Sequence, residues 1–371
     1  MTVQSVFDPL MAAALTRAGL VSVLARQSRR QWILGLSAVV ILFAVVMTSA
    51  ALGVERLTPR QVLRAGLASW LPEQWLRDLS PMQIAVVQNL RLPRTIMAVI
   101  SGAGLAMAGV AMQGITRNPL VSPYTLGISP AAAFGASIAI LLGWNSLAHS
   151  GPYITVAMAF TSASLCALIV LGLASLRGVT SMMLILGGVA LTYLFGALTA
   201  TVQFASNEQQ LAAIVHWTFG SLNGRTWDEA AIAGCVWVLC AALLWTQAAA
   251  LNAFAAGGDD AAATLGFAVA RTRVIVTLAA VMCSAAIVSF TGVIAFVGLV
   301  APHIARMLIG ADHRVLLPFS AVIGALLVLL ADLIGRLVFA PVVVPVGIVI
   351  AYIGVPLFLH LLMTRRQEMS S

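Results

Sequence analysis

The stretch LRLPRTIMAVISGAGLAMAGVAMQGITRNPL, residues 90–120, decides the fold class. It carries no charged residue between Arg94 and Arg117. A helix needs about 20 apolar residues to cross a hydrocarbon core about 30 Å thick, because each residue rises about 1.5 Å. Residues 95–113 therefore predict a membrane-spanning helix. Small residues inside it predict close contact with neighbouring helices: Gly102, Gly104, Ala106, Ala108 and Gly109.

Apolar runs of this kind recur along the 371-residue chain, which is 61% hydrophobic and only 9% charged. Soluble domains carry about a quarter charged residues, so a water-soluble globule is excluded. The charge-free stretch 118–176 is too long for one span, and its polar break at 143–152 divides it in two. The 42 residues from Arg273 to Arg314 are predicted to cross the membrane twice, so one of the two helices there is expected to be short. In all, ten spans are predicted: 32–54, 95–113, two within 118–176, 181–205, 230–250, 273–289, 292–308, 317–335 and 346–363.

The expected fold is all-α, a polytopic membrane protein with about ten transmembrane helices. Positively charged loops stay in the cytoplasm. With the N-terminus inside, twelve arginines are cytoplasmic and eight are outside, six of these on the segment 55–94. We therefore expect both termini in the cytoplasm. Residues 1–30 are expected to be a cytoplasmic segment with a surface helix, 31–366 the transmembrane domain and 367–371 a cytoplasmic tail.

Several kinds of chemistry are excluded by what the chain lacks. All 20 basic residues are arginine, so the chain has neither the lysine of a P-loop ATPase nor a Schiff-base lysine. The formal charge of +8 is scattered between apolar runs, which does not indicate nucleic-acid binding. The five histidines and four cysteines show no metal-binding or redox spacing. We expect no catalytic residue, no metal site and no cofactor bound by this chain.

One carboxylate, Asp332, lies within a predicted span, four residues before Arg336. This spacing places both side chains on one helix face and favours an internal ion pair. A secondary transporter usually needs intramembrane carboxylates or a broken-helix ion site. An ion-coupled secondary transporter of a small solute therefore stays open as the alternative function.

Three segments resemble a known family. They are residues 89–136, which contain the strings LRLPR and RNPL; residues 185–197, ILGGVALTYLFGA, with the stretch from Val215; and residues 291–318, TGVIAFVGLVAPHIARMLIGADHRVLLP, continuing through LLLADLIGR. Together they resemble the FecCD/BtuC-type permease family, the membrane subunits of type II ABC importers for ferric siderophores, haem and cobalamin. The resemblance runs from about Trp32 to Arg366.

The resemblance implies a permease subunit without a nucleotide site of its own. ATP and Mg would be bound by two copies of a separate ATP-binding subunit, and a periplasmic substrate-binding protein would deliver the cargo. A second permease chain, expected to be identical although a related chain stays open, would complete the pathway. The implied location is the bacterial inner membrane, in contact with lipid. The implied cargo is a bulky iron chelate, with a ferric siderophore first, haem next and cobalamin third.

The resemblance also assigns roles to single residues at the outer side. Arg91 and Arg336, with Arg94 as a weaker candidate, would receive acidic residues of the binding protein. Two simpler interpretations stay open: Arg91 and Arg94 mark the headgroup end of a helix, and Arg336 only pairs with Asp332. The stretch 209–227 resembles a short periplasmic helix. Its His216 is expected to be an interfacial residue rather than a ligand for a haem iron.

At the inner side, residues 251–273 resemble the loop that couples the permease to the ATPase subunit, a pair of short helices. Gly258 and Gly266 permit sharp turns around a small helix, and Asp259 and Asp260 suit its positive N-terminal end. Ala262 and Leu265 complete the candidate contact, a solvated loop is the alternative, and Arg271 and Arg273 are expected to be inside anchors. Two gates are implied, one at the turn of Asn118, Pro119 and Leu120 and one at Thr180 and Ser181.

Overall fold

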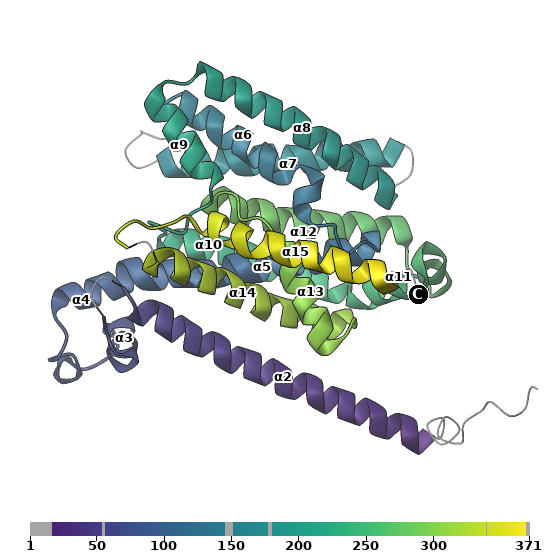
Figure 1. Ribbon diagram of the computed structural model, residues 1–371, viewed down its shortest axis with the longest axis horizontal. Helices are drawn as coiled ribbons and strands as arrows, with labels where there is room; N and C mark the ends of the chain where they lie inside the picture. Colours follow the sequence, from purple (N-terminus) through teal and green to yellow (C-terminus); the bar gives the residue numbers. More distant parts are fainter. Residues whose placement is uncertain (1–16, 54–55, 145–150, 177–179, 339, 369–371) are drawn as a thin grey trace, which may run out of the picture.

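The computed structural model describes residues 17–53, 56–144, 151–176, 180–338 and 340–368. Within these ranges the chain is helical and contains no β-strand (Figure 1), which confirms the all-α class. Parts of the predicted N-terminal segment, of the break at 143–152 and of the C-terminal tail fall outside these ranges, at 1–16, 145–150 and 369–371.

Seven helices are long and apolar enough to cross a membrane, among the residues that could be searched. They lie within α2 (Arg17–Ala51), the continuous run into α5 (Leu92–Thr116), α7 (Gly151–Leu176), α8 (Ser181–Ala205), α10 (Trp227–Thr246), α12 (Val269–Thr291) and α14 (His313–Leu337). Three shorter apolar helices are α6 (Ile128–Leu141), α13 (Val297–Ile309) and the start of α15 (Val346–Glu368). These helices match the ten predicted spans in order, and the short helix expected between Arg273 and Arg314 is α13.

Most predicted bounds differ from the structure by a few residues, and two of the differences change how the helices connect. The helix expected on the surface before Arg30 runs without a break into the first span, so that α2 begins at Arg17. The span predicted to end at Ala250 ends at Thr246, and a new helix, α11 (Ala248–Thr264), follows after Gln247. Hydropathy does not show this break, because residues on both sides of it are apolar.

Short elements join the long helices, and capping boxes start several of them. These elements are α3 (Pro59–Gly66), η1 (Glu73–Trp75), α4 (Pro81–Val86), the π-helical turn η2 (Val87–Arg91), η3 (Pro123–Leu126) and α9 (Glu208–Thr218). Thr58 and Ser80 each accept a hydrogen bond from the backbone N–H of a glutamine three residues on, and that glutamine's side chain accepts one from the backbone N–H of the capping residue. Asn207 starts α9 in the same way. Such reciprocal bonds satisfy backbone donors that a helix start leaves unpaired.

The helices are arranged around α5 (Figure 1), which packs against α14, α12, α13 and α10. Helices α6, α7, α8 and α9 form a layer on one side of this group. Helix α2 lies on the opposite side, where it packs mainly against α14 and is the least buried of the seven long helices. Most of its apolar surface therefore faces lipid.

Glycines let the backbone of α5 touch two neighbours directly. A Cβ atom added to Gly102 would lie 2.1 Å from the carbonyl oxygen of Gly324 on α14, and one added to Gly109 would lie 2.0 Å from that of Gly298 on α13. Helices approach this closely in a membrane when small residues face each other. The small residues of the second span thus have the packing role that the sequence predicts.

The two ends of the bundle carry different elements. We call the end with α3, α4 and α9 the outer end and the end with α11 the inner end, after the sides predicted for them; they lie left and right in Figure 1. The outer end is joined by a bond from Trp227 Nε1 to the Gln88 carbonyl, at 2.8 Å. The inner end is joined by Gln31 Nε2 to the Ile309 carbonyl and by Trp245 Nε1 to the Arg314 carbonyl, at 3.0 and 3.2 Å.

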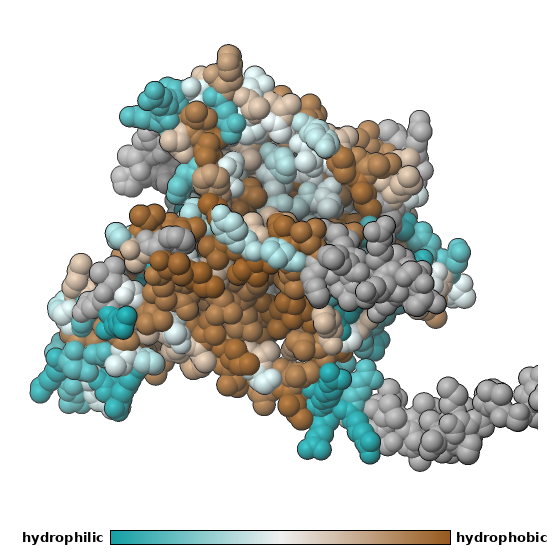
Figure 2. Space-filling model, in the orientation of Figure 1, coloured by the Kyte–Doolittle hydropathy of each residue, from teal (hydrophilic) through white to brown (hydrophobic). Residues whose placement is uncertain are grey.

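The surface has the pattern of an integral membrane protein. Figure 2 shows an apolar band across the middle of the molecule, with polar residues gathered over the outer helices and near the start of α2. Many large apolar side chains on α2 and α8 are exposed, for example Trp32, Phe43 and Phe204. A surface of this kind is stable only where lipid or another membrane helix covers it.

The glycine contact makes a direct prediction. We expect Gly102→Leu to destabilise the protein by about 1–3 kcal/mol or more, because the new side chain overlaps the backbone of α14. The control is Gly35→Leu on α2, where nothing lies within 4 Å of an added Cβ atom. Thermal unfolding in detergent measures both variants, and an equal midpoint for the two would contradict the proposed close contact.

Candidate functional site

At the outer end, a buried carboxylate binds two arginines from different helices. Asp332 on α14 accepts hydrogen bonds from Arg94 on α5, with 2.7 Å between Nη2 and Oδ1. It also pairs with Arg336, with 3.0 Å between Nε and Oδ2. The pair that the four-residue spacing predicts is therefore present. Its second arginine has no sequence signal, because Arg94 is 238 residues away along the chain.

The geometry of the α5–α14 contact explains how Arg94 reaches Asp332. The two helices run in opposite directions and touch at Gly102 and Gly324. Arg94 precedes Gly102 by eight residues and Asp332 follows Gly324 by eight, so both lie about 12 Å from the contact toward the outer end. One glycine contact thus fixes the register of the ion pair.

The same cluster holds the end of α2. Arg336 donates to the hydroxyl and carbonyl oxygens of Ser49, at 2.7 and 3.2 Å, and to the Leu52 carbonyl at 3.1 Å. Arg91 donates to the carbonyls of Ala50 and Ala51, at 3.0 and 3.1 Å. These carbonyls belong to the last turn of α2, where the helix dipole favours cations.

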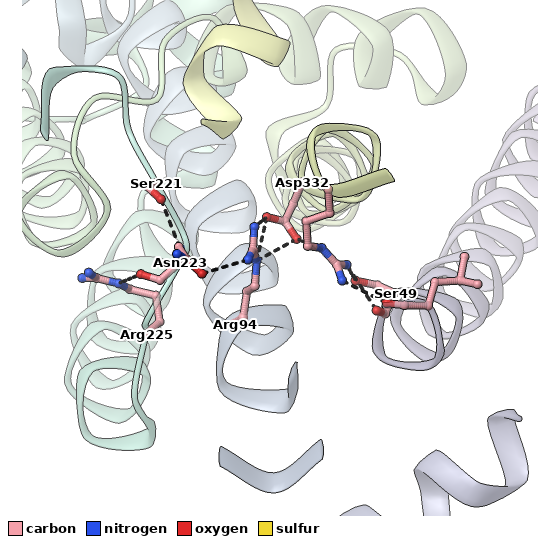
Figure 3. A network of polar contacts seen from close by, with 8 residues as sticks. Ser49, Arg94, Ser221, Asn223, Arg225 and Asp332 are labelled. Atoms are coloured by element: carbon pink, nitrogen blue, oxygen red, sulfur yellow. Dashed lines mark hydrogen bonds and ion pairs between the residues drawn. The ribbon is translucent and has the colours of Figure 1, made fainter. Parts of the chain in front are cut away.

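Figure 3 shows that the network continues on the other side of Arg94. Its Nη1 donates to the Asn223 side-chain oxygen at 3.2 Å, and the Asn223 backbone is held by Ser221 and Arg225. Polar contacts therefore run from α2 through α14 and α5 to the loop that precedes α10. We call this set the outer arginine network: Ser49, Arg91, Arg94, Ser221, Asn223, Arg225, Asp332 and Arg336.

The structure brings together the three arginines that the sequence analysis assigns to docking. Each of them is engaged with groups of this chain, and the side chains of Arg94 and Arg336 are both only 13% exposed. Arg94 and Arg336 share the Asp332 carboxylate, and Arg91 is bound to the end of α2 beside them.

A cavity of about 320 Å³ lies beside the network, at the outer end. Its lining includes Thr155, His216, Trp217, Asn223 and Arg225. His216 sits next to Trp217 on α9, at the place predicted for a short periplasmic helix. Among the residues that could be searched, no three His, Cys, Asp or Glu side chains lie together to hold a metal ion.

At the inner end, α11 has the shape predicted for the coupling loop. Gly258 has φ 78° and ψ −149°, which divides α11 into two short helices, and Gly266 turns the chain with φ 86°. Only glycine adopts such angles readily. Ala262 packs inward against Phe254, whereas Asp259, Asp260 and Leu265 point outward, with Leu265 65% exposed.

This loop is attached to the starts of two long helices and to the end of a third. Asp259 pairs with Arg273 on α12 at 2.7 Å, and Arg273 also lies over the Phe254 ring. Arg273 is therefore a buried partner of the loop and more than the inside anchor that the sequence predicts. The Gly258 backbone faces Arg117 at the end of α5, since an added Cβ atom would lie 2.6 Å from its Nη1.

Asn252 joins α11 to α14 and is a residue that the sequence analysis missed. Its Nδ2 donates to Asp312 Oδ1 at 2.7 Å, and its Oδ1 accepts from the His313 backbone N–H at 2.8 Å. Asn252 and Asp312 are 60 residues apart, so no spacing rule could indicate this contact. Two hydrogen bonds therefore tie the loop to the start of α14.

The predicted gate residues form two turns of the chain. The Asn118 side-chain oxygen accepts from the Leu120 backbone N–H at 3.0 Å, which fixes the turn that Pro119 begins, and Leu120 is exposed. Thr180 caps α8 by accepting from the Met183 backbone N–H at 3.3 Å, and Ser181 is the first residue of that helix. The Ser181 side chain lies outside the described residues.

Comparison with known proteins identifies the chain's relatives. A family model described as the FecCD transport family matches residues 39–364. A cobalamin import system permease protein of Halobacterium salinarum is 35% identical over 88% of this chain and 94% of its own. A protein of Bacillus subtilis named as a siderophore transport system permease is 34% identical over 92% of this chain and 97% of its own. The solved structure of a metal-chelate type ABC transporter in an inward-facing conformation has a TM-score of 0.77 and 31% identity, covering 89% of this chain and 98% of that one.

The outer arginine network predicts a large effect of one substitution. We expect Asp332→Asn to lower stability by about 3–5 kcal/mol, because two largely buried guanidinium groups lose their only carboxylate partner within the described chain. The matched control is Asp78→Asn, which removes the more exposed pair with Arg64 and should change stability by less than about 1 kcal/mol. Unfolding midpoints in detergent compare the two, and similar small losses for both would contradict the role of Asp332.

Proposed function

Because this chain belongs to the FecCD transport family of ABC transporter permeases, we propose that it carries a bulky metal chelate from the periplasm to the cytoplasm by alternating access. The observation that supports this most is the kinked helix α11, which presents Leu265 outward and is tied to three long helices. A segment with this geometry can transmit the movement of a separate subunit to the membrane-spanning helices. The energy would come from two copies of an ATP-binding subunit that hold ATP and Mg.

The coupling step follows from the contacts of α11. We propose that the ATP-binding subunit binds α11 at Asp259, Asp260, Leu265 and Gly266. Its movement would then displace α12 through Arg273 and α14 through Asn252. It would displace α5 through the contact between Gly258 and Arg117. Because α12 and α14 both pack on α5, the displacement reaches several helices rather than one.

Docking of a periplasmic binding protein is proposed for the outer end. Acidic residues of that partner would approach Arg91, Arg94 and Arg336, which lie together at the outer end. Such charge pairs guide association and fix its register, and they weaken with salt. Since the same arginines hold α2, α5 and α14 together, docking would act on these helices directly.

A second permease chain, identical in our proposal, would cover α8. Its exposed side carries small residues at helical spacing, including Ala190, Gly196, Ala197 and Ala200, beside the exposed Tyr193. An atom added at Gly196 would have nothing within 4 Å, so packing within this chain does not require a glycine there. Small residues of this kind permit a close approach by another membrane helix.

Our first proposal for the cargo is a ferric siderophore, followed by haem and then cobalamin. The cobalamin and siderophore relatives are 35% and 34% identical, so similarity alone does not choose between them. The outer cavity of about 320 Å³ lies at the lower end of the range for small-molecule pockets. A bulky chelate therefore fits better in a passage between two chains than inside one.

The ion-coupled alternative has less support. It needs an intramembrane carboxylate free to bind a proton or a metal cation. Asp332 is the one carboxylate of the described spans that lies in the buried bundle away from a helix start, and two arginines occupy its oxygens.

We further propose a bacterial inner-membrane location with both termini in the cytoplasm, which places α11 where ATP is available.

Transport by reconstituted complexes tests the proposed function. Vesicles that contain this chain, its ATP-binding subunit and the binding protein should take up ferric siderophore with ATP and without any ion gradient.

Leu265→Asp should reduce both co-purification of the ATP-binding subunit and uptake at least tenfold, because it places a charge in an apolar contact. The control Leu63→Asp changes a leucine on the outer helix α3 that is also exposed. Uptake that follows an ion gradient without ATP would contradict the importer.

The docking proposal is tested by Arg91→Gln. We expect binding-protein affinity to fall about five- to tenfold and its salt dependence to become weaker, because one partner of a charge pair is removed. Arg271→Gln removes the same charge from the inner end, where the side chain is exposed, and should leave the affinity unchanged. Surface plasmon resonance with complexes in nanodiscs gives both values; equal affinity for the two variants would exclude a docking role for Arg91.

A further inference from the structure

A small pocket lies at the inner end, between the beginning of α2 and the end of α13. Its volume is about 250 Å³. Gln27, Arg30 and Gln31 line it from α2, and residues 306–310 line it from α13. Gln31 Nε2 bridges the two helices by donating to the Ile309 carbonyl at 3.0 Å. The pocket is therefore a seam between helices with a polar floor.

The pocket is strongly cationic. Arg30 and Arg306 both line it, and no aspartate or glutamate does. Arg30 forms no hydrogen bond or ion pair with the described part of the chain, and the neighbouring Arg26 and Arg29 are exposed as well. Arg306 donates to the Gln113 side-chain oxygen at 3.1 Å, which orients its guanidinium.

Exposed apolar residues accompany the polar lining. Trp32 and Ile33, which are 77% and 57% exposed, directly follow Gln31 on α2, and Met307, which is 71% exposed, is itself part of the lining. Helix α2 diverges from the bundle in this region (Figure 1), and Figure 2 shows polar residues there next to a continuous apolar surface. An occupant that satisfies both surfaces has an anionic head and long apolar chains.

We propose that this pocket binds the headgroup of an anionic phospholipid, with the phosphate between Arg30 and Arg306 and the acyl chains along Trp32 and Ile33. Guanidinium groups match phosphate oxygens in pairs of hydrogen bonds. Basic pockets between membrane helices on the cytoplasmic side bind such headgroups. The lipid would hold the inner half of α2 to α13, where few protein contacts do so. The proposal rests on the proposed orientation, with this end of the bundle in the cytoplasm, and does not depend on the cargo.

Native mass spectrometry of the purified full-length chain tests this, with phosphatidylglycerol and phosphatidylcholine added as probes. We expect phosphatidylglycerol to bind more tightly, and we expect Arg30→Gln and Arg306→Gln each to weaken it about fivefold. Arg30→Lys keeps the charge but loses the paired donors, so its binding should lie between that of the unchanged chain and that of Arg30→Gln. The matched control is Arg60→Gln, which removes an exposed arginine from the outer end and should change nothing.

Two outcomes would overturn the proposal. Equal binding of both lipids, or unchanged phosphatidylglycerol binding in Arg30→Gln, would show that the arginines serve only the C-terminal dipole of α13. Loss of the ATP-binding subunit from Arg30→Gln with unchanged lipid binding would assign the pocket to a protein contact. Since Arg30 has no protein partner to lose in the described chain, a folding defect is not expected for that variant.

Discussion

The structure depends on one backbone contact, the meeting of Gly102 on α5 with Gly324 on α14. It sets the register of two antiparallel helices, and the register determines what lies at both ends. Toward the outer end it places Arg94 against Asp332. Toward the inner end, Gly114 follows Gly102 by twelve residues and meets His313, which precedes Gly324 by eleven; an atom added at Gly114 would lie 2.8 Å from His313 Nε2. A side chain at either glycine would shift both ends together.

The two ends of this helix pair carry the contacts that transport would use. The outer arginine network joins α2, α5 and α14 around one carboxylate. The inner loop joins α5, α12 and α14 through Arg117, Arg273 and Asn252. The helices α5 and α14 take part in both sets. In our proposal, docking outside and nucleotide-driven motion inside act on the same pair of helices.

The sequence predicts those features that depend on local spacing or composition. The bounds of α8 match the expected span, because Thr180 caps it and the run to Ala205 is apolar. The pair of Asp332 and Arg336 follows from helical periodicity. The kink at Gly258 is predicted because glycine permits a sharp turn, because Asp259 and Asp260 suit the start of a helix, and because the segment resembles the family's coupling loop. What the sequence did not reveal is long-range: Arg94 on Asp332, Asn252 on Asp312, and Arg273 on Asp259. These partners are 238, 60 and 14 residues apart along the chain, and each pair joins two different helices, so helical periodicity within one element cannot indicate it.

We expect α5 and α14 to move as one body, because the glycine contact fixes their register, and a distance between spin labels measures this. Leu90, just before α5, and Leu337, at the end of α14, are both exposed and can carry the labels after the four native cysteines are replaced. Double electron–electron resonance then compares the complex without nucleotide and with bound ATP. The account predicts a distance that changes by less than about 2 Å, the scale of small helix shifts. A change of about 5 Å or more, a full helical turn, would contradict it.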